Sequence, residues 1–283
     1  MKFLYNPNLK VEWNSFFRFS IAFYCILSLF SFWEDIPKIL IQGDLTHDSA
    51  LAVLHNFIAK YGFTISFDDF IYLAIYAYLF MLGLLCLGAF TRISALFAFL
   101  FNLIITKSIN DGLHEANYFA TSALFYCVIF PRGKFSMDYY IKEFEINETL
   151  LKWSLYLLQA HLCLIYFLSG IGKSLNIDWQ LLSGTNYDVQ IPLSRFILPE
   201  ALSAGISFFV IIIEIFYPVF INYSKTRKLW LAMTILLHVC IISLTGFYFF
   251  GILMIILNIS AYYIPFLKSS PDNDGESEEQ LAY

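Results

Sequence analysis

The sequence predicts an all-α, polytopic integral membrane protein, a helical bundle with about eight transmembrane helices. Of its 283 residues, 59% are hydrophobic and 14% are charged, and the mean hydropathy is +0.67, far above that of a soluble domain. Apolar runs of 14 to 23 residues recur along the chain between polar connectors, and about 20 residues suffice to cross a bilayer. The basic residues are scattered along these connectors and form no dense face, which excludes nucleic acid as a partner.

Eight apolar runs are the expected membrane spans. The first carries Arg18, whose long side chain we expect to reach the near interface. This run is too long for a signal-peptide core and no small-residue cleavage site follows it, so it should stay as a helix. In chain order the runs are Asn14–Phe32, Phe70–Phe90, Ile93–Thr106, Ala116–Phe130, Trp153–Gly172, Ala201–Ile221, Leu229–Leu244 and Thr245–Leu267. The third and fourth are shorter than a usual crossing, so their boundaries are the least defined.

The basic residues also set the expected orientation. With the N-terminus in the cytoplasm, eleven lysines and arginines of the connectors lie inside and five outside, which agrees with the positive-inside rule. Residues 1–267 then form one membrane domain with both termini cytoplasmic. Residues 268–283 are an acidic tail that we expect to be disordered. Lys173 and the loops that carry His114 and Trp179 face the outer side.

The connectors and cysteines suggest no metal. Leu51–Ile58, which contains His55, is expected to be a short helix at the membrane interface. His55 and the nearby His47 are expected to be solvated because no third ligand is evident. All five cysteines fall inside apolar spans, which favours small buried hydrophobic groups over disulfides or a metal cluster.

The segment from Trp153 to Trp179 carries the most unusual placements. About twenty mostly apolar residues, with His161 near their middle, end at Ser169–Gly172, where two glycines are expected to loosen the helix just before Lys173. An imidazole inside a membrane helix and an ammonium at its end are both costly. Each placement therefore calls for a structural or chemical reason.

Two interpretations of the intramembrane polar residues remain open. Counting about 1.5 Å per residue, His161, Glu214 and His238 fall at similar depths on consecutive spans, so they form a candidate site below Lys173. Alternatively, they make a polar contact that only fixes helix packing. Lys173 is either a wet cation favoured by the helix dipole or an amine partly withdrawn from water beside Trp179, neutral enough to act as a base.

Several short motifs lie in one order along some 250 residues of the chain. The most specific is Tyr166–Lys173 (YFLSGIGK), followed by Asp178-Trp179 and Gly184. The further segments are Phe16–Phe19, Leu87–Arg92, Ser136–Asp138 and Arg227–His238. In these motifs the sequence resembles the vitamin K-dependent gamma-carboxylase family, whose bacterial members are grouped as horizontally transferred transmembrane domain proteins.

The resemblance implies a reaction. Lys173 is the base that deprotonates a reduced quinone, a vitamin K or menaquinone hydroquinone, which reacts with O₂ to give an epoxide and a strong base that allows CO₂ to add to a peptide glutamate. His238 and His161 would orient or protonate quinone oxygens, and Glu214 would set the imidazole tautomer. The chemistry needs an apolar slot protected from bulk water and no metal.

Two departures from the family widen the functional alternatives. The chain has no large soluble region after its last span, and Asn117 stands where the animal enzymes show a histidine, with His114 a turn earlier. We expect His114, Asn117 and Trp179 to contribute to substrate binding. The alternatives are epoxidation without carboxylation, a helper for maturation or export of a small secreted peptide toxin, and a quinone-binding subunit without turnover. The expected partners are membrane lipid, quinone and a small peptide, in a bacterial inner membrane.

Overall fold

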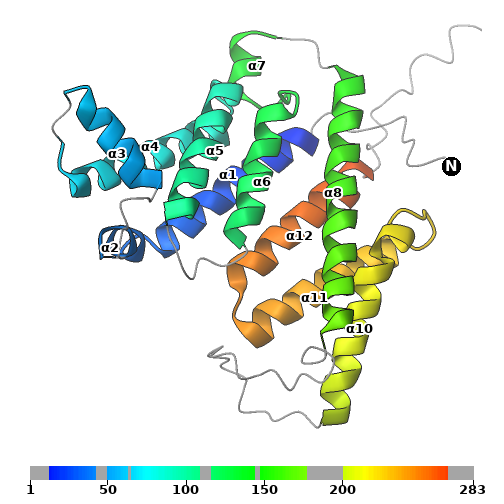
Figure 1. The fold of residues 1–283 in the computed structure, drawn as a ribbon. Helices are drawn as coiled ribbons and strands as arrows, with labels where there is room; N and C mark the ends of the chain where they lie inside the picture. The colour runs from blue at the N-terminus through cyan, green and yellow to red at the C-terminus, as the bar shows by residue number, and fades with distance from the viewer. Residues whose placement is uncertain are drawn as a thin grey trace, which may run out of the picture.

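The computed structural model describes residues 13–42, 50–62, 65–108, 116–143, 147–176 and 200–266. Within these ranges the regular structure is helical and includes no strand, so the predicted all-α class is confirmed for the described chain (Figure 1). The helices are α1 (Trp13–Ser31), α2 (Asp35–Gln42), α3 (Ala50–Lys60), α4 (Phe67–Leu87), α5 (Thr91–Ser108), α6 (Ala116–Ile129), α7 (Met137–Ile141), α8 (Glu148–Leu175), α10 (Glu200–Phe220), α11 (Arg227–Thr245) and α12 (Tyr248–Tyr262), followed by the short 3₁₀ helix η1 (Ile264–Phe266).

Four described helices are long and apolar enough to cross a membrane, which makes the chain a membrane protein by length and composition. They are α1, α4, α5 and the Thr149–Leu175 part of α8. The other predicted runs also fall on helices: α6 and α12 are shorter apolar helices, as is the Gly205–Phe220 part of α10, and α11 covers the remaining run. The predicted runs are therefore helical, and four of them meet the length of a full span.

The helices pack into two groups that meet along α12. On one side, α5 lies between α4 and α6, and α1 packs against α4, α6 and α12. On the other side, α8 packs most extensively on α10, and α11 joins α10 to α12 (Figure 1). The contact between α6 and α8 is small, so α12 is the main bridge between the two groups.

In the connecting segments one predicted helix is confirmed, and the predictions for His55 and for the cysteines are corrected. The helix α3 includes the expected Leu51–Ile58 segment, and His55 is bonded through Nε2 to the Ile65 carbonyl at 2.9 Å rather than only solvated. All five cysteines are free, but only Cys25 and Cys127 are buried as expected; Cys86 and Cys163 are half-buried and Cys240 is exposed. His47 and the 268–283 tail lie outside the described residues.

The helix α8 is longer than predicted at its C-terminal end. It continues through Gly170 and Gly172 and ends only at Leu175, with Asn176 as the C-cap. Tertiary packing outweighs the helix-weakening effect of glycine here. A Cβ at Gly170 would lie 2.8 Å from the backbone nitrogen of Ile215 on α10, whereas one at Gly172 would meet nothing within 4 Å. Gly170 therefore allows close approach of two helices and does not break its own.

A buried polar group, which we call the Arg18 cluster (Arg18, Gly88, Ser136 and Asp138), ties α1, the α4–α5 turn and α7 together. Arg18 donates through Nη1 to the carbonyls of Leu85 and, at 3.0 Å, Cys86, and through Nη2 to that of Phe135 at 2.6 Å. It is 6% exposed. Arg18 therefore binds carbonyls at the end of α4 and in the segment before α7, and whether it reaches the membrane interface stays a prediction.

The α4–α5 turn depends on glycine at position 88. Gly88 has φ +70°, a conformation that costs other residues energy. A Cβ there would also lie 2.6 Å from Cβ of Ser136 and 2.9 Å from Cζ of Arg18. Asp138 completes the turn by accepting the backbone N–H groups of Phe90 and Thr91 at 2.7 and 2.8 Å, at the start of α5.

Candidate functional site

Residues of α8, α10, α11 and α12 form a second buried polar group, which we call the Lys173 cluster: Tyr166, Lys173, Glu214, Tyr217, His238 and Asn258. Tyr166, Gly170 and Lys173 recur at spacings of four and three along α8, which places them on one helix face. Glu214 and Tyr217 share a face of α10 for the same reason. The absence of a Cβ at Gly170 lets these two faces meet.

The helices α8 and α10 run antiparallel, and three successive contacts define their register. Cys163 lies opposite Asn222, at 3.4 Å between Sγ and Nδ2. The rings of Tyr166 and Tyr217 stack with centroids 4.1 Å apart. Beyond Gly170, the Lys173 ammonium reaches Oε1 of Glu214 at 2.5 Å. Glu214 therefore lies level with the C-terminal end of α8.

This register corrects the predicted depths of the three intramembrane residues. His161 is twelve residues before Lys173, about 18 Å along the helix, and it bonds instead to the hydroxyl of Tyr126 on α6, at 2.6 Å from Nδ1. The prediction placed each residue by counting from the end of its span at the membrane surface. Because α8 continues further than expected at its C-terminal end, a different part of α8 lies opposite Glu214. Glu214 and His238 are brought together, and His161 is not.

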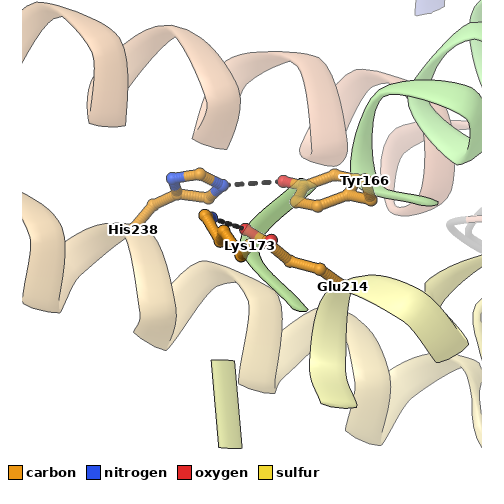
Figure 2. Close-up of polar contacts among 4 residues, drawn as sticks. All are labelled: Tyr166, Lys173, Glu214 and His238. Atoms are coloured by element: carbon orange, nitrogen blue, oxygen red, sulfur yellow. Dashed lines mark hydrogen bonds and ion pairs between the residues drawn. The ribbon is translucent and has the colours of Figure 1, made fainter. Parts of the chain in front are cut away.

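Lys173 points into the bundle. Its side chain is 18% exposed and that of Glu214 is 6% exposed. Figure 2 shows the lysine head beside the His238 ring, and the two groups are close enough to interact electrostatically. The sequence left a wet lysine open as an alternative; the geometry instead gives Lys173 a buried carboxylate and an imidazole as neighbours.

His238 is held by a tyrosine and not by Glu214. Its Nε2 lies 2.7 Å from the hydroxyl of Tyr166 (Figure 2). Asn258 on α12 donates to the same hydroxyl at 2.7 Å, and the Tyr217 hydroxyl donates to Oδ1 of Asn258 at 2.6 Å. The expectation that Glu214 orients the imidazole is therefore not met, because the carboxylate is already engaged by Lys173.

Two polar atoms of this cluster are buried without a hydrogen-bond partner among the described residues. They are Oε2 of Glu214 and Nδ1 of His238. Buried polar groups are nearly always paired, so these two atoms, one acceptor and one donor or acceptor, are unusual features beside the Lys173 amine.

A separate small cavity lies among α1, α2, α4, α5 and α6, away from Lys173. Its volume is about 40 Å³, and Tyr24, Asn102, Thr106 and Asn117 are among its lining residues. This volume holds a few water molecules and is far below the roughly 300 Å³ of a pocket for a drug-sized ring. The cavity includes the expected residue Asn117 but is too small to be a quinone site.

His114 and Trp179 lie outside the described residues. Among the described residues, no group of three or more histidine, cysteine and acidic side chains could hold a metal ion.

The sequence did not lead us to predict three members of the Lys173 cluster as site residues. Tyr166 was part of the Tyr166–Lys173 motif only, and Tyr217 and Asn258 were not predicted. Signals for them exist: Tyr166 precedes Lys173 by two helical turns, Tyr217 follows Glu214 by one, and Asn258 is an amide within an uncharged apolar run.

No protein-family model, no curated protein and no solved structure matches this chain.

Proposed function

We propose that this protein is a bacterial inner-membrane enzyme resembling the membrane part of vitamin K-dependent gamma-carboxylase, with all eight apolar helices crossing the bilayer and both termini cytoplasmic. Its reaction is the oxygen-dependent epoxidation of a reduced quinone. The balance is quinol plus O₂ giving quinone epoxide plus water. The same assay measures whether this reaction is coupled to CO₂ addition on a small peptide.

The observation that carries the proposal is the inward direction of the Lys173 amine. It lies within 2.5 Å of a buried carboxylate and beside a buried imidazole, at the end of an apolar helix. Titratable groups inside a membrane bundle are expensive and mark functional sites. A lysine that served only to set the membrane orientation of the chain would have its ammonium group in water.

Lys173 and Glu214 act together as the base. One proton is shared between an amine and a carboxylate at this distance, so the pair is either ammonium with carboxylate or amine with carboxylic acid. Accepting one hydroxyl proton from the substrate leads from either form to the same product, an ammonium next to a carboxylic acid. The pair therefore gains one positive charge next to the substrate oxygen that becomes negative, which stabilises that oxygen.

The experiment incubates membranes containing the protein with reduced menaquinone or vitamin K, O₂ and bicarbonate, and detects the epoxide by mass spectrometry. Lys173→Ala is expected to lower the initial rate by at least about a hundredfold, a usual contribution of a general base. Lys107→Ala is the matched control, since Lys107 also lies in the last turn of an apolar helix but sits over the Tyr118 ring, 5.6 Å from its centroid. It should leave the rate unchanged.

Two results would overturn the assignment: no epoxide from the wild-type protein, or equal epoxide from wild type and Lys173→Ala. The first result would favour the peptide-toxin helper. In that case the protein should instead be needed for release of a small peptide encoded beside it. If epoxide forms and no carboxylated glutamate is found in any peptide, the reaction stops at the epoxide.

A further inference from the structure

The hydrogen bonds around Asn258 fix the orientation of its amide. Nδ2 lies 2.8 Å from the backbone carbonyl of Met254, one turn earlier on α12. A carbonyl oxygen can only accept a hydrogen bond, so the group facing it must be the amide NH₂. Exchanging the two ends of the amide would place two acceptor oxygens at this distance. Oδ1 therefore faces the Tyr217 hydroxyl, which donates to it at 2.6 Å.

The amide orientation in turn fixes the proton of Tyr166. Asn258 Nδ2 donates to the Tyr166 hydroxyl at 2.7 Å and cannot accept from it. The hydroxyl has a single proton, and the acceptor that it can reach is Nε2 of His238, at 2.7 Å. Tyr166 is therefore the donor in the Tyr166–His238 bond.

The imidazole is left with one possible neutral form. Because Nε2 accepts a hydrogen bond, the ring proton lies on Nδ1. A doubly protonated ring would direct a second donor at Tyr166 and leave the proton of that hydroxyl without an acceptor. It would also add a second cation beside Lys173.

We infer that Asn258 and Tyr166 hold His238 as its Nδ1–H tautomer, and that this buried N–H donates a hydrogen bond to an oxygen of a bound ligand. Nδ1 has no hydrogen-bond partner among the described residues, and an unpaired buried donor is expensive. Tyr166 and Asn258 are positioning residues in this scheme. The ligand oxygen is a ring carbonyl or phenolate, and this identity alone rests on the proposed function.

The tautomer is measured directly by ¹⁵N NMR of the full-length protein labelled at histidine, in detergent micelles. Protonated and unprotonated ring nitrogens have well-separated ¹⁵N shifts, and His238→Gln identifies the His238 signals among the five histidines. The expected wild-type spectrum has a protonated Nδ1 and an unprotonated Nε2. A protonated Nε2, or a ring exchanging between both forms, would overturn the inference without any variant.

Two tyrosine substitutions then separate positioning from packing. Tyr166 and Tyr217 are both fully buried and stack on each other, so Tyr166→Phe and Tyr217→Phe disturb the packing to a similar degree. Tyr166→Phe removes the donor to Nε2 and should raise the population of the Nε2–H form. Tyr217→Phe should not, because Met254 still orients the amide. Equal effects of the two substitutions would contradict the scheme.

The ligand is tested with 2,3-dimethyl-1,4-naphthoquinone, which has carbonyl acceptors and no free quinone-ring position for thiol addition. Its binding should move the Nδ1 shift of wild-type His238 and leave His161 unchanged. No movement at saturating probe would refute a ring carbonyl as the partner, while the tautomer measurement stands by itself. If His238 has the Nδ1–H tautomer but no epoxide forms, the proposed epoxidation is refuted, whereas the hydrogen-bond chain from Asn258 through Tyr166 to His238 stands.

Discussion

The Arg18 and Lys173 clusters both bury a cation within an apolar helical bundle, but they pair it with different groups. Arg18 binds three backbone carbonyls, with Nε as the guanidinium nitrogen left without a partner among the described residues. Lys173 binds a titratable carboxylate and lies beside a titratable imidazole, and each of these keeps one buried atom without a hydrogen-bond partner in the described part of the chain. Backbone carbonyls cannot exchange protons with a substrate, whereas a carboxylate and an imidazole can. The first cluster therefore stabilises the fold, and the second has the composition of a reactive site.

The comparison also separates the segments on which the family resemblance rests. Those around Arg18, Gly88 and Asp138 meet in the Arg18 cluster, where a positive φ and helix-end hydrogen bonds explain the residue types. The segments ending in Lys173 and His238 supply the groups that the proposed reaction requires. Loss of the first set should reduce stability, and loss of the second should reduce activity.

The largest expected effect on stability is that of Arg18→Met. It removes three charge-assisted bonds to buried carbonyls and should lower the free energy of unfolding by about 3 kcal/mol. Thermal or denaturant unfolding in detergent measures this change. If Arg18→Met unfolds at the wild-type temperature, the structural role of the Arg18 cluster is wrong.

Glu214→Leu is expected to lower the free energy of unfolding by less, about 2 kcal/mol, because the Lys173 ammonium that loses its carboxylate is 18% exposed. The double variant Lys173→Met/Glu214→Leu should recover to within about 1 kcal/mol of wild type, since a buried ion pair is often replaced by apolar residues at little cost. The double variant should remain without epoxidase activity. A double variant less stable than Glu214→Leu alone would make the pair a structural element like Arg18.

Gly170→Ala and Gly172→Ala test the close contact that brings Lys173 to Glu214. The added methyl at position 170 meets the Ile215 backbone and should cost about 1 to 2 kcal/mol, together with a loss of activity. At position 172 it meets open space and should stabilise the helix by up to about 1 kcal/mol. Equal unfolding temperatures for the two variants would contradict the register of α8 against α10.

The smallest expected effect is the pH dependence at Asp138. Burial acts to raise the pKa of Asp138, but the N–H bonds from Thr91 and Phe90 outweigh it and hold the pKa below its ordinary value. A carboxyl with a depressed folded-state pKa stabilises above its unfolded pKa, about 3.9, and this contribution is lost as the pH falls towards the folded value.

Asp138→Asn should therefore lower the free energy of unfolding by about 1 kcal/mol at neutral pH, as for loss of a helix cap. Below about pH 4 the unfolding free energies of wild type and variant should converge. Unfolding curves at pH 7 and pH 3 measure both values. A constant difference between them would show that the carboxylate charge is not what binds the start of α5.

Composition and the length of apolar runs determined the helical membrane class, because a hydrocarbon environment requires backbone groups to be paired within the chain. The same patterns predicted the eight apolar helices but not the short helices α2 and α7. The cost of buried charge singled out Lys173, Glu214 and His238. Tertiary packing decided the partners. The contact at Gly170 set the α8–α10 register, which paired Lys173 with Glu214, gave His238 to Tyr166 and left His161 to Tyr126. Register depends on which side chains interlock between helices distant in sequence, and periodicity within one helix carries no information about it.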